Sequence, residues 1–210
     1  QHRSDIIVVA GGEHVTARPQ DALGKNIDYV VCDEGEQSIS ILIQQISEGR
    51  QAPAVIKSQL IEALDTIPLP ALDCLHTESY RPTDMGLLIS ARGCPFHCGF
   101  CALSVVWGNK VRYHSVDRVI KEIVLRKERY GTEYFSFRNG TFTLNQRWVT
   151  DICQLLIKRQ LRVKWECLTR VGHFDDALLE LMKAAGCNRI RIGIESGSPR
   201  ILHYMNKNIT

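Results

Sequence analysis

The sequence lacks any long apolar run and any strong excess of charge of one sign. Its 26 Lys and Arg residues are nearly balanced by 23 Asp and Glu residues, so the net charge is only +3. That balance provides no electrostatic basis for binding nucleic acid or an anionic membrane. No stretch approaches the roughly 18 apolar residues of a membrane-spanning helix, and the N-terminus lacks the pattern of a secretory signal. We therefore expect a cytoplasmic protein with neither a nucleic-acid partner nor a membrane span.

An initiator Met is also missing, because the chain begins with Gln1. We therefore expect the 210 residues to be an internal part of a longer protein. Hydrophobic residues make up 44% of the chain and charged residues 23%, which is ordinary for a folded domain and excludes a wholly disordered chain. The length allows one or two domains at roughly 100–200 residues each.

The eight cysteines do not form the pattern of a small secreted disulfide scaffold, which would be shorter and denser in Cys. Five of them are scattered among apolar or helical segments, and we predict that they are small buried residues. These five are Cys32, Cys74, Cys153, Cys167 and Cys187. The other three lie within eight residues of one another, which indicates a reducing compartment and a metal centre.

The first 66 residues predict an incomplete α/β domain. The apolar runs 6–10 and 29–32 are typical of parallel strands buried on both faces, and the first is followed by Gly11 and Gly12. A helix follows with one apolar face, formed by Ile39, Leu42, Ile43 and Ile46, and ends near Gly49. Two strands and one helix are too few for a doubly wound domain, so we interpret residues 1–66 as the back half of one. Residues 67–85 contain three prolines and predict a linker.

From residue 86 onward, strand patterns alternate with helix patterns. The predicted strands span residues 86–90, 134–137, 163–168 and 189–194. The predicted helices span residues 116–130, 148–158, 175–185 and 199–205. Four βα units in series predict a parallel barrel of the TIM type, and the chain stops before such a barrel could close. We therefore predict a partial barrel over residues 86–210.

The strongest motif lies directly after the first predicted barrel strand. Cys94, Cys98 and Cys101 can converge on one metal centre from a single loop. A structural zinc site usually takes four protein ligands, and His97 is a poor candidate for the fourth because a neighbour of a ligand usually points away. Three thiolates fit an iron–sulfur cubane that leaves one iron open.

The Cys-x3-Cys-x2-Cys spacing after a first barrel strand resembles the radical S-adenosylmethionine (SAM) superfamily, and specifically its branch with an N-terminal cobalamin-binding domain. The resemblance extends over nearly the whole chain. In the barrel region it is carried by residues 89–94 (ISARGC), 134–142 (YFSFRNGTF), 178–187 (LLELMKAAGC) and 193–198 (GIESGS). In the front region it is carried by residues 8–16 (VVAGGEHVT) with Pro19, 28–31 (DYVV) and 35–36 (GE).

This resemblance implies three cofactors: a [4Fe–4S] cluster on the three cysteines, SAM and cobalamin. It also implies roles for individual residues, since Phe100 matches the position whose ring lies near the SAM adenine. Glu195 and Ser196 match the segment that contacts the SAM ribose, and Arg170 lies where it could pair with the SAM carboxylate. Gly11 and Gly12 match the place where the nucleotide tail of cobalamin lies, which agrees with the close backbone approach that glycine allows.

Two departures from the family pattern bear on these roles. Relatives often carry acidic residues after the second barrel strand, near the SAM amino group, where this chain has Arg138, Asn139 and Gly140. This departure hints at a changed substrate. The Asp-x-His-x-x-Gly signature, whose His ligates cobalt in many relatives, is absent from this chain and would lie upstream of Gln1.

The resemblance favours a cobalamin-dependent radical methyltransferase that acts on a small molecule, with a reductase, flavodoxin or ferredoxin as electron donor. A radical oxidase or cyclase of the anaerobic tetrapyrrole type is the alternative. A methylated product with S-adenosylhomocysteine would separate the two. A non-catalytic iron–sulfur or cobalamin-binding module is a third hypothesis, and it would release no 5′-deoxyadenosine under reducing, anaerobic conditions.

Overall fold

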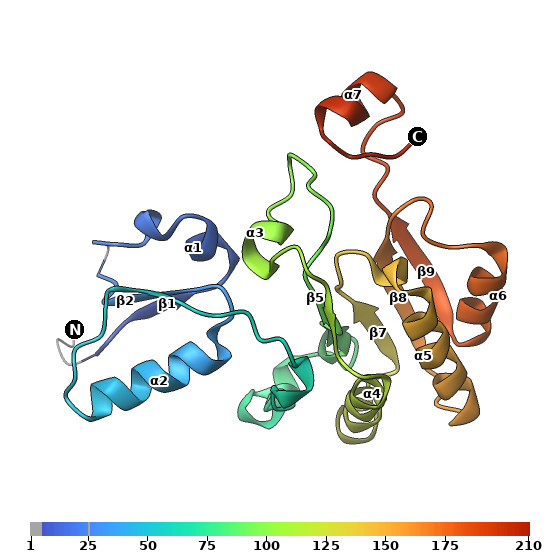
Figure 1. Cartoon of the computed structure of the whole chain (residues 1–210). Coiled ribbons are helices and arrows are strands. Elements are labelled where there is room, and N and C mark those ends of the chain that lie inside the picture. Colours follow the sequence, from blue (N-terminus) through green and yellow to red (C-terminus); the bar gives the residue numbers. More distant parts are fainter. Residues whose placement is uncertain (1–5, 25) are drawn as a thin grey trace. The chain divides into compact units, whose positions relative to one another are not determined.

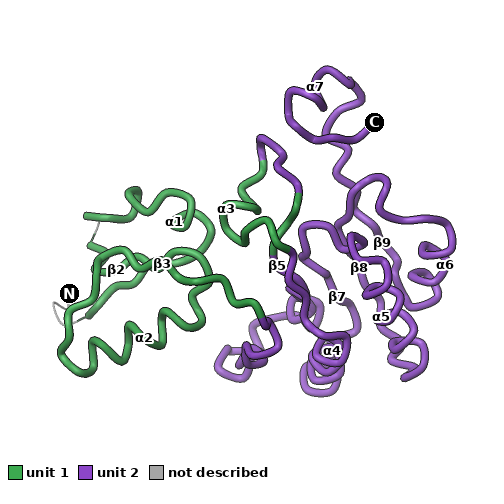
Figure 2. Tube along the Cα trace, viewed as in Figure 1, with its two compact units in different colours: residues 1–62, 93–95, 101–110 green, residues 63–92, 96–100, 111–210 purple. Residues whose placement is uncertain are grey.

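The computed structural model of the chain describes residues 6–24 and 26–210 (Figure 1). The polar lead predicted at residues 1–5 lies outside these residues. The chain divides into two compact units (Figure 2). The first unit comprises residues 1–62, 93–95 and 101–110, and the second comprises residues 63–92, 96–100 and 111–210. The domain limits from the sequence, at 1–66, 67–85 and 86–210, stay a prediction.

The first unit contains a three-stranded parallel sheet in the order β1-β2-β3. Its strands are β1 (Val9–Gly11), β2 (Tyr29–Cys32) and β3 (Val55–Lys57). Its helices are α1 (Glu13–Ala17), α2 (Gly35–Ser47) and α3 (Leu103–Trp107). The sequence pattern does not predict β3, because two apolar residues followed by a lysine give no recognisable period. It also placed the first strand too early, at residues 6–10.

Helix α2 buries a narrower face than its sequence predicts. Leu42 and Ser38, one turn apart, are buried, but Ile43 is 61% exposed although it was predicted to face the core. The reason is that a sheet of three short strands contacts the helix along one line of residues at i and i+4. Ile43 is rotated by about 100° from Leu42, which carries it beyond that contact.

The second unit contains a four-stranded sheet in the order β4-β7-β8-β9, and every neighbouring pair is parallel. Its strands are β4 (Leu87–Leu88), β7 (Tyr134–Phe137), β8 (Lys164–Thr169) and β9 (Cys187–Ile192). The helices that follow these strands are α4 (Val116–Tyr130), α5 (Gln146–Lys158), α6 (Asp176–Ala184) and α7 (Pro199–Tyr204) (Figure 1). The prediction of four parallel strands in series, each followed by a helix, is confirmed.

Local capping rules account for both ends of α4 and for the start of α6. The Ser115 hydroxyl accepts a hydrogen bond from the backbone N–H of Arg118 at 3.2 Å, and α4 ends at Gly131, whose φ is +65°. The Asp175 carboxylate likewise accepts from the N–H of Leu178 at 2.8 Å at the start of α6. None of the described helices is long and apolar enough to cross a membrane.

One face of this sheet forms the core of the second unit. Phe135 and Phe137 of β7 and Trp165 and Cys167 of β8 point to this face and are almost fully buried. They pack with the apolar sides of α4, α5 and α6, which matches the period-2 alternation of strands and the 3.6-residue period of helices. The intervening residues, among them Ser136 and Glu166, point to the opposite face.

The first predicted barrel strand differs from its expected range of 86–90. Gly86 lies in a 3₁₀ turn, Asp84–Gly86, and a Cβ atom there would lie 1.9 Å from the Tyr134 carbonyl oxygen. The strand therefore begins only after Gly86 and spans two residues. The chain then enters an antiparallel ribbon of β5 (Ala91–Arg92) and β6 (Arg112–Tyr113). The cysteine motif therefore lies in the connection between the two strands of this ribbon, rather than directly after the barrel strand.

The segment before β4 contains only 3₁₀ turns. These are Leu64–Thr66, Leu72–Cys74, Thr77–Ser79 and Asp84–Gly86. Cys74 is exposed, which makes the prediction of a buried residue wrong at this position. A surface segment without a helix or strand has no apolar face on which to bury a small side chain. Cys32, Cys153 and Cys167 are buried as predicted, and Cys187 is partly buried.

Candidate functional site

The three cysteines of the motif have different surroundings. Cys94 is buried, and its backbone N–H donates to the Gly108 carbonyl at 3.1 Å. Cys98 is partly exposed and Cys101 is exposed. Across residues 6–24 and 26–210, no three His, Cys, Asp or Glu side chains are grouped to hold a metal ion. Ligation of one cluster by Cys94, Cys98 and Cys101 therefore stays a prediction.

The middle of the cysteine loop, residues 96–100, is anchored to a distant part of the second unit. The backbone N–H of Gly99 donates to the Met205 carbonyl at 2.8 Å, and the Asn206 side-chain amide donates to the His97 carbonyl at 2.8 Å. Nothing in the sequence indicated these partners, because more than 100 residues separate them from the loop. The two hydrogen bonds restrict the backbone on both sides of Cys98.

Arg170, just past the end of β8, lies beside the same loop. Its side chain is buried, and Nη1 lies 3.6 Å from Cys98 Sγ. The guanidinium group lies over the Phe96 ring at 4.1 Å from the centroid, and that ring contacts His173 at 5.4 Å between centroids. Nη2 of Arg170 is buried and has no hydrogen-bond partner among the described residues.

This environment suits an anionic ligand. A buried N–H group without an acceptor is costly, and a charged one more so, which favours binding of a group that supplies the missing oxygen or sulfur. The pKa of His173 is lowered by burial and by the nearby Arg170 charge, so the imidazole does not readily add a second cation here. A carboxylate beside Cys98, or a cluster ligated by its thiolate, would supply the acceptor that the Arg170 guanidinium lacks.

Glu195 is engaged by a cation that sequence analysis did not identify. Lys207 Nζ lies 3.1 Å from Glu195 Oε1, and the lysine side chain is only 9% exposed. The same Nζ lies 5.5 Å from the centroid of the Phe100 ring. A Cβ atom on Gly193 would lie 2.8 Å from Glu195 Oε1 and 3.1 Å from Lys207 Nζ, so the ion pair occupies the space that glycine leaves.

Phe100 and Glu195, two of the residues predicted to bind SAM, thus both lie near Lys207 in the second unit. Phe100 is 51% exposed, which leaves its ring accessible for stacking. Ser196 lies in a tight turn, where its N–H donates to the Ile194 carbonyl at 2.8 Å and its hydroxyl accepts from the N–H of Ser198 at 3.1 Å. The backbone of Glu195 has a φ of +64°, an unusual value for a residue with a side chain.

Asn139 joins the end of β7 to the segment that leads into the cysteine loop. It is buried, and its Oδ1 accepts hydrogen bonds from the N–H of Ser90 at 3.0 Å, the Ser90 hydroxyl at 3.1 Å and the N–H of Ala91 at 3.1 Å. Its Nδ2 donates to the Ser90 hydroxyl at 3.0 Å. Relatives often have acidic residues at this position. In this chain the Asn139 amide instead binds the backbone at Ser90 and Ala91 and holds the segment before the cysteine loop.

We expect Asn139→Ala to lower the free energy of unfolding by about 2–4 kcal/mol, because buried donors at Ser90 and Ala91 would lose their acceptor. Urea denaturation followed by circular dichroism measures this loss. Asn139→Asp is the matched control: it keeps the acceptor oxygen and should lose less stability than the alanine variant. Equal losses in the two variants would contradict the role assigned to Oδ1.

Gly11 and Gly12 lie at the carboxyl edge of the first sheet, where β1 turns into α1. Gly12 has a φ of +104°, and a Cβ atom there would have nothing within 4 Å. A Cβ atom on Gly11 would lie 3.6 Å from the Val31 carbonyl oxygen, an ordinary contact. The free space around Gly12 leaves its backbone open to a bulky group. Ligands of open parallel sheets bind at this same edge.

Three cysteines outside the motif meet although they are far apart in the sequence. The thiols of Cys167 and Cys187, on neighbouring strands, share a hydrogen bond, and Cys153 of α5 lies close enough to interact with both electrostatically. Burial raises the pKa of Cys153 to about 12. The hydrogen bond raises the pKa of Cys167 and lowers that of Cys187.

Comparison with known proteins identifies the family. The model of the radical SAM superfamily matches residues 88–210. An uncharacterized methyltransferase of Pyrococcus horikoshii is 35% identical over 98% of this chain and 49% of its own length. An anaerobic magnesium-protoporphyrin IX monomethyl ester cyclase of Rubrivivax gelatinosus is 30% identical over 98% of this chain and 41% of its own length. The chain thus spans about half the length of these relatives or less.

Solved structures share the fold. The radical SAM methyltransferase TsrM from Kitasatospora setae matches 94% of this chain and 43% of its own with a TM-score of 0.77 at 20% identity. The cobalamin-dependent SAM radical enzyme OxsB matches 97% of this chain and 33% of its own with a TM-score of 0.76 at 21% identity. The α/β fold with parallel sheets is therefore similar to that of cobalamin-dependent radical SAM enzymes, and the chain belongs to the radical SAM superfamily.

Proposed function

We propose that the chain is part of a cobalamin-dependent radical SAM methyltransferase. In this proposal Cys94, Cys98 and Cys101 bind a [4Fe–4S] cluster, which supplies the electron for reductive cleavage of SAM. The observation that carries the proposal is the buried guanidinium of Arg170, with its unpartnered Nη2, beside Cys98. The family match, which includes all three cysteines, supports the same assignment.

The remaining residues of the proposed site bind and orient SAM. Arg170 pairs with the carboxylate of SAM through its free N–H group, because a charge-assisted hydrogen bond satisfies both partners. The exposed ring of Phe100 stacks on the adenine, and Glu195 with Ser196 binds the ribose. Lys207 holds the Glu195 carboxylate in place through its 3.1 Å contact.

Cobalamin binds to the first unit in this proposal, at the open backbone of Gly11 and Gly12. The proposed domains are a partial cobalamin-binding domain at residues 1–66, a linker at 67–85 and a partial radical SAM barrel at 86–210. The proposed place of action is the cytoplasm, with a flavodoxin, a ferredoxin or a reductase as the source of electrons.

Methyl transfer is favoured over ring formation because methyltransferases are frequent among the relatives. Besides the protein of Pyrococcus, they include a bacteriochlorophyllide d C-12(1)-methyltransferase of Chlorobaculum tepidum, 28% identical over 96% of this chain and 44% of its own length. The cyclase of Rubrivivax is comparably similar, which keeps the oxidase or cyclase reaction as the second candidate.

The test is anaerobic incubation of the reconstituted protein with SAM, cobalamin and a strong reductant. Release of 5′-deoxyadenosine is expected, since SAM cleavage does not require that the methyl acceptor be identified first. A protein that binds the cluster but releases none would be a binding module. With a candidate acceptor, methylated product together with S-adenosylhomocysteine supports methyl transfer, whereas 5′-deoxyadenosine without any methylated product supports the cyclase.

Glu195→Gln should weaken SAM binding by about ten- to a hundred-fold, because ribose hydroxyls would lose a charged acceptor. Iron content should stay unchanged, since no cysteine is affected. Anaerobic titration of SAM measures the effect, and Glu180→Gln, on the exposed side of α6, is the control. Unchanged SAM affinity in the Glu195 variant would remove this residue from the site.

A further inference from the structure

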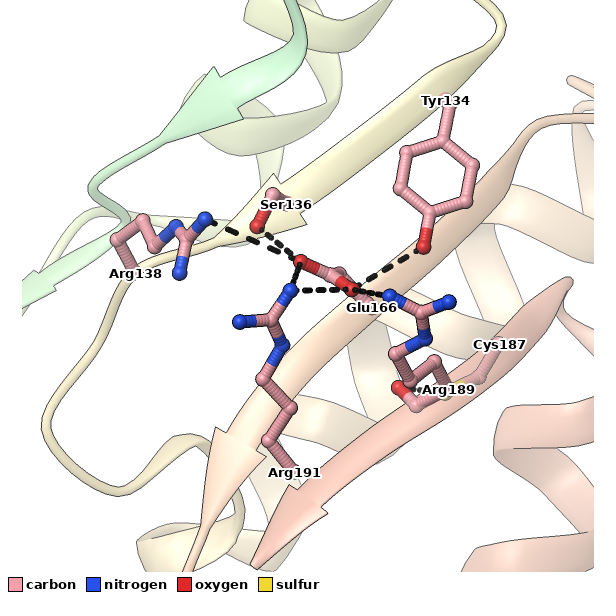
Figure 3. A network of polar contacts seen from close by, with 7 residues as sticks. All are labelled: Tyr134, Ser136, Arg138, Glu166, Cys187, Arg189 and Arg191. Carbon is pink, nitrogen blue, oxygen red and sulfur yellow. Dashed lines mark hydrogen bonds and ion pairs between the residues drawn. The ribbon is translucent and has the colours of Figure 1, made fainter. Parts of the chain in front are cut away.

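Three arginines surround one buried glutamate on the face of the second sheet that lacks helices (Figure 3). Glu166, in the middle of β8, has a side chain that is 5% exposed. Arg191 Nη2 lies 3.0 and 3.2 Å from its two oxygens, Arg189 Nη1 lies 3.4 Å away and Arg138 Nη2 lies 4.0 Å away. Ser136 and Tyr134 donate from β7 at 2.8 and 3.2 Å.

Glu166 remains ionised in this setting. Burial by itself would raise the pKa of the carboxyl group, but the hydrogen bonds from Ser136 and Arg191 outweigh burial, and the pKa is lowered. The pKa of Tyr134 is raised by burial and by the Glu166 charge, so the phenol remains a donor. Three cations facing one anion leave the group with a net charge of +2.

Most of the N–H donors of the three guanidinium groups do not contact Glu166. Each guanidinium carries five N–H groups, yet each arginine reaches Glu166 through a single nitrogen. The side chains of Arg138, Arg189 and Arg191 are 46%, 62% and 47% exposed, so their other donors are accessible. Glu166 therefore acts as an anchor that holds three guanidinium groups in one place without neutralising them.

Glu166, Arg189 and Arg191 lie apart from the residues proposed to bind SAM, whereas Arg138 occupies the position after β7 that lies near the SAM amino group in relatives. Glu166 precedes Arg170 by four residues, about 13 Å along an extended chain. Arg189 and Arg191 lie within β9, on the open face of the sheet, and Arg138 directly follows the last residue of β7. The face around them carries the exposed apolar side chains of Leu87, Ile89 and Leu168, which would contact the uncharged part of a ligand.

We propose that Arg138, Arg189 and Arg191 form a binding site for an oxyanion, either a carboxylate or a phosphate, on the substrate of this enzyme. Planar guanidinium groups match both oxyanions in geometry and charge. As an assignment of substrate class, the inference rests on the proposed function. Its test uses neither the cluster nor SAM, so failure of anion binding and failure of SAM cleavage are separate results.

The experiment is calorimetric titration of the 210-residue chain with pyrophosphate and, separately, with succinate at low ionic strength. Saturable binding of at least one probe is expected. Arg191→Gln and Arg189→Gln should each weaken it by about tenfold, the loss of one charge-assisted hydrogen bond. Arg159→Gln, at the end of α5 and paired with Asp117 at 3.9 Å, is the control and should bind as the parent does.

Preference for pyrophosphate would assign the site to a phosphate-bearing substrate, and preference for succinate would assign it to a carboxylate. Absence of saturable binding for both probes would overturn the proposal, as would equal affinity in the parent, Arg189→Gln and Arg191→Gln. Circular dichroism establishes that each variant is folded. If Arg191→Gln does not fold, Arg138→Gln replaces it, because Arg138 has the longest contact with Glu166.

Discussion

Replacing Cys94, Cys98 and Cys101 together by alanine is expected to reduce the iron of the anaerobically reconstituted protein from about four atoms per chain to almost none. The three thiolates are the proposed ligands of the cluster, because their spacing allows them to reach one metal centre from a single loop. Iron analysis and the brown absorbance of the cluster measure the result.

A matched control replaces one cysteine outside the motif. Cys74 is exposed, so the Cys74→Ala variant removes a thiol with little effect on the core. It should keep the full iron content. Iron retained by the triple variant would contradict the assigned ligands, and iron lost by the control would show that a thiol outside the motif takes part.

Arg170→Met should weaken SAM binding by about ten- to a hundred-fold while the iron content stays normal. Methionine fills much of the same volume beside Phe96 but offers no N–H group to the SAM carboxylate. Anaerobic titration of SAM into the reconstituted protein, with iron quantified in the same sample, measures both quantities.

Arg170→Lys provides the control for charge. It keeps a cation at the same place but loses the planar set of donors, so SAM affinity should lie between those of the parent and Arg170→Met. Normal affinity in the methionine variant would exclude pairing with SAM. Loss of iron in that variant would instead make Arg170 a support of the loop around Cys98.

The sequence by itself was sufficient to predict the features that depend on local pattern. The spacing of Cys94, Cys98 and Cys101 is a property of one loop and needs no tertiary information. The alternating strands and helices from residue 86 onward follow from hydrophobic period and from caps such as Ser115 and Gly131. The period and the caps predicted the parallel order of the second sheet, and the resemblance of the motifs predicted the family; both predictions are confirmed.

The sequence pattern does not predict elements that are too short to show a hydrophobic period. Strand β3 has three residues and β4 has two, so neither contains enough residues to show alternation. Directly before β4, Gly86 approaches the Tyr134 backbone closely, a contact across 48 residues that the local sequence does not reveal. The exposure of Ile43 depends on the width of the sheet under α2, which the helix's own sequence does not encode.

Only the tertiary structure decided which polar and charged side chains meet. Lys207 pairs with Glu195, Arg170 reaches Cys98, and Asn139 binds Ser90, in each case through residues on different elements. Arg138 directly follows β7, and Arg189 and Arg191 lie in β9, so their meeting at Glu166 depends on the parallel register of β7, β8 and β9. Sequence pattern specifies which face of an element a residue occupies, whereas pairing across elements requires their relative placement, because hydrogen bonds and ion pairs act over only a few ångströms.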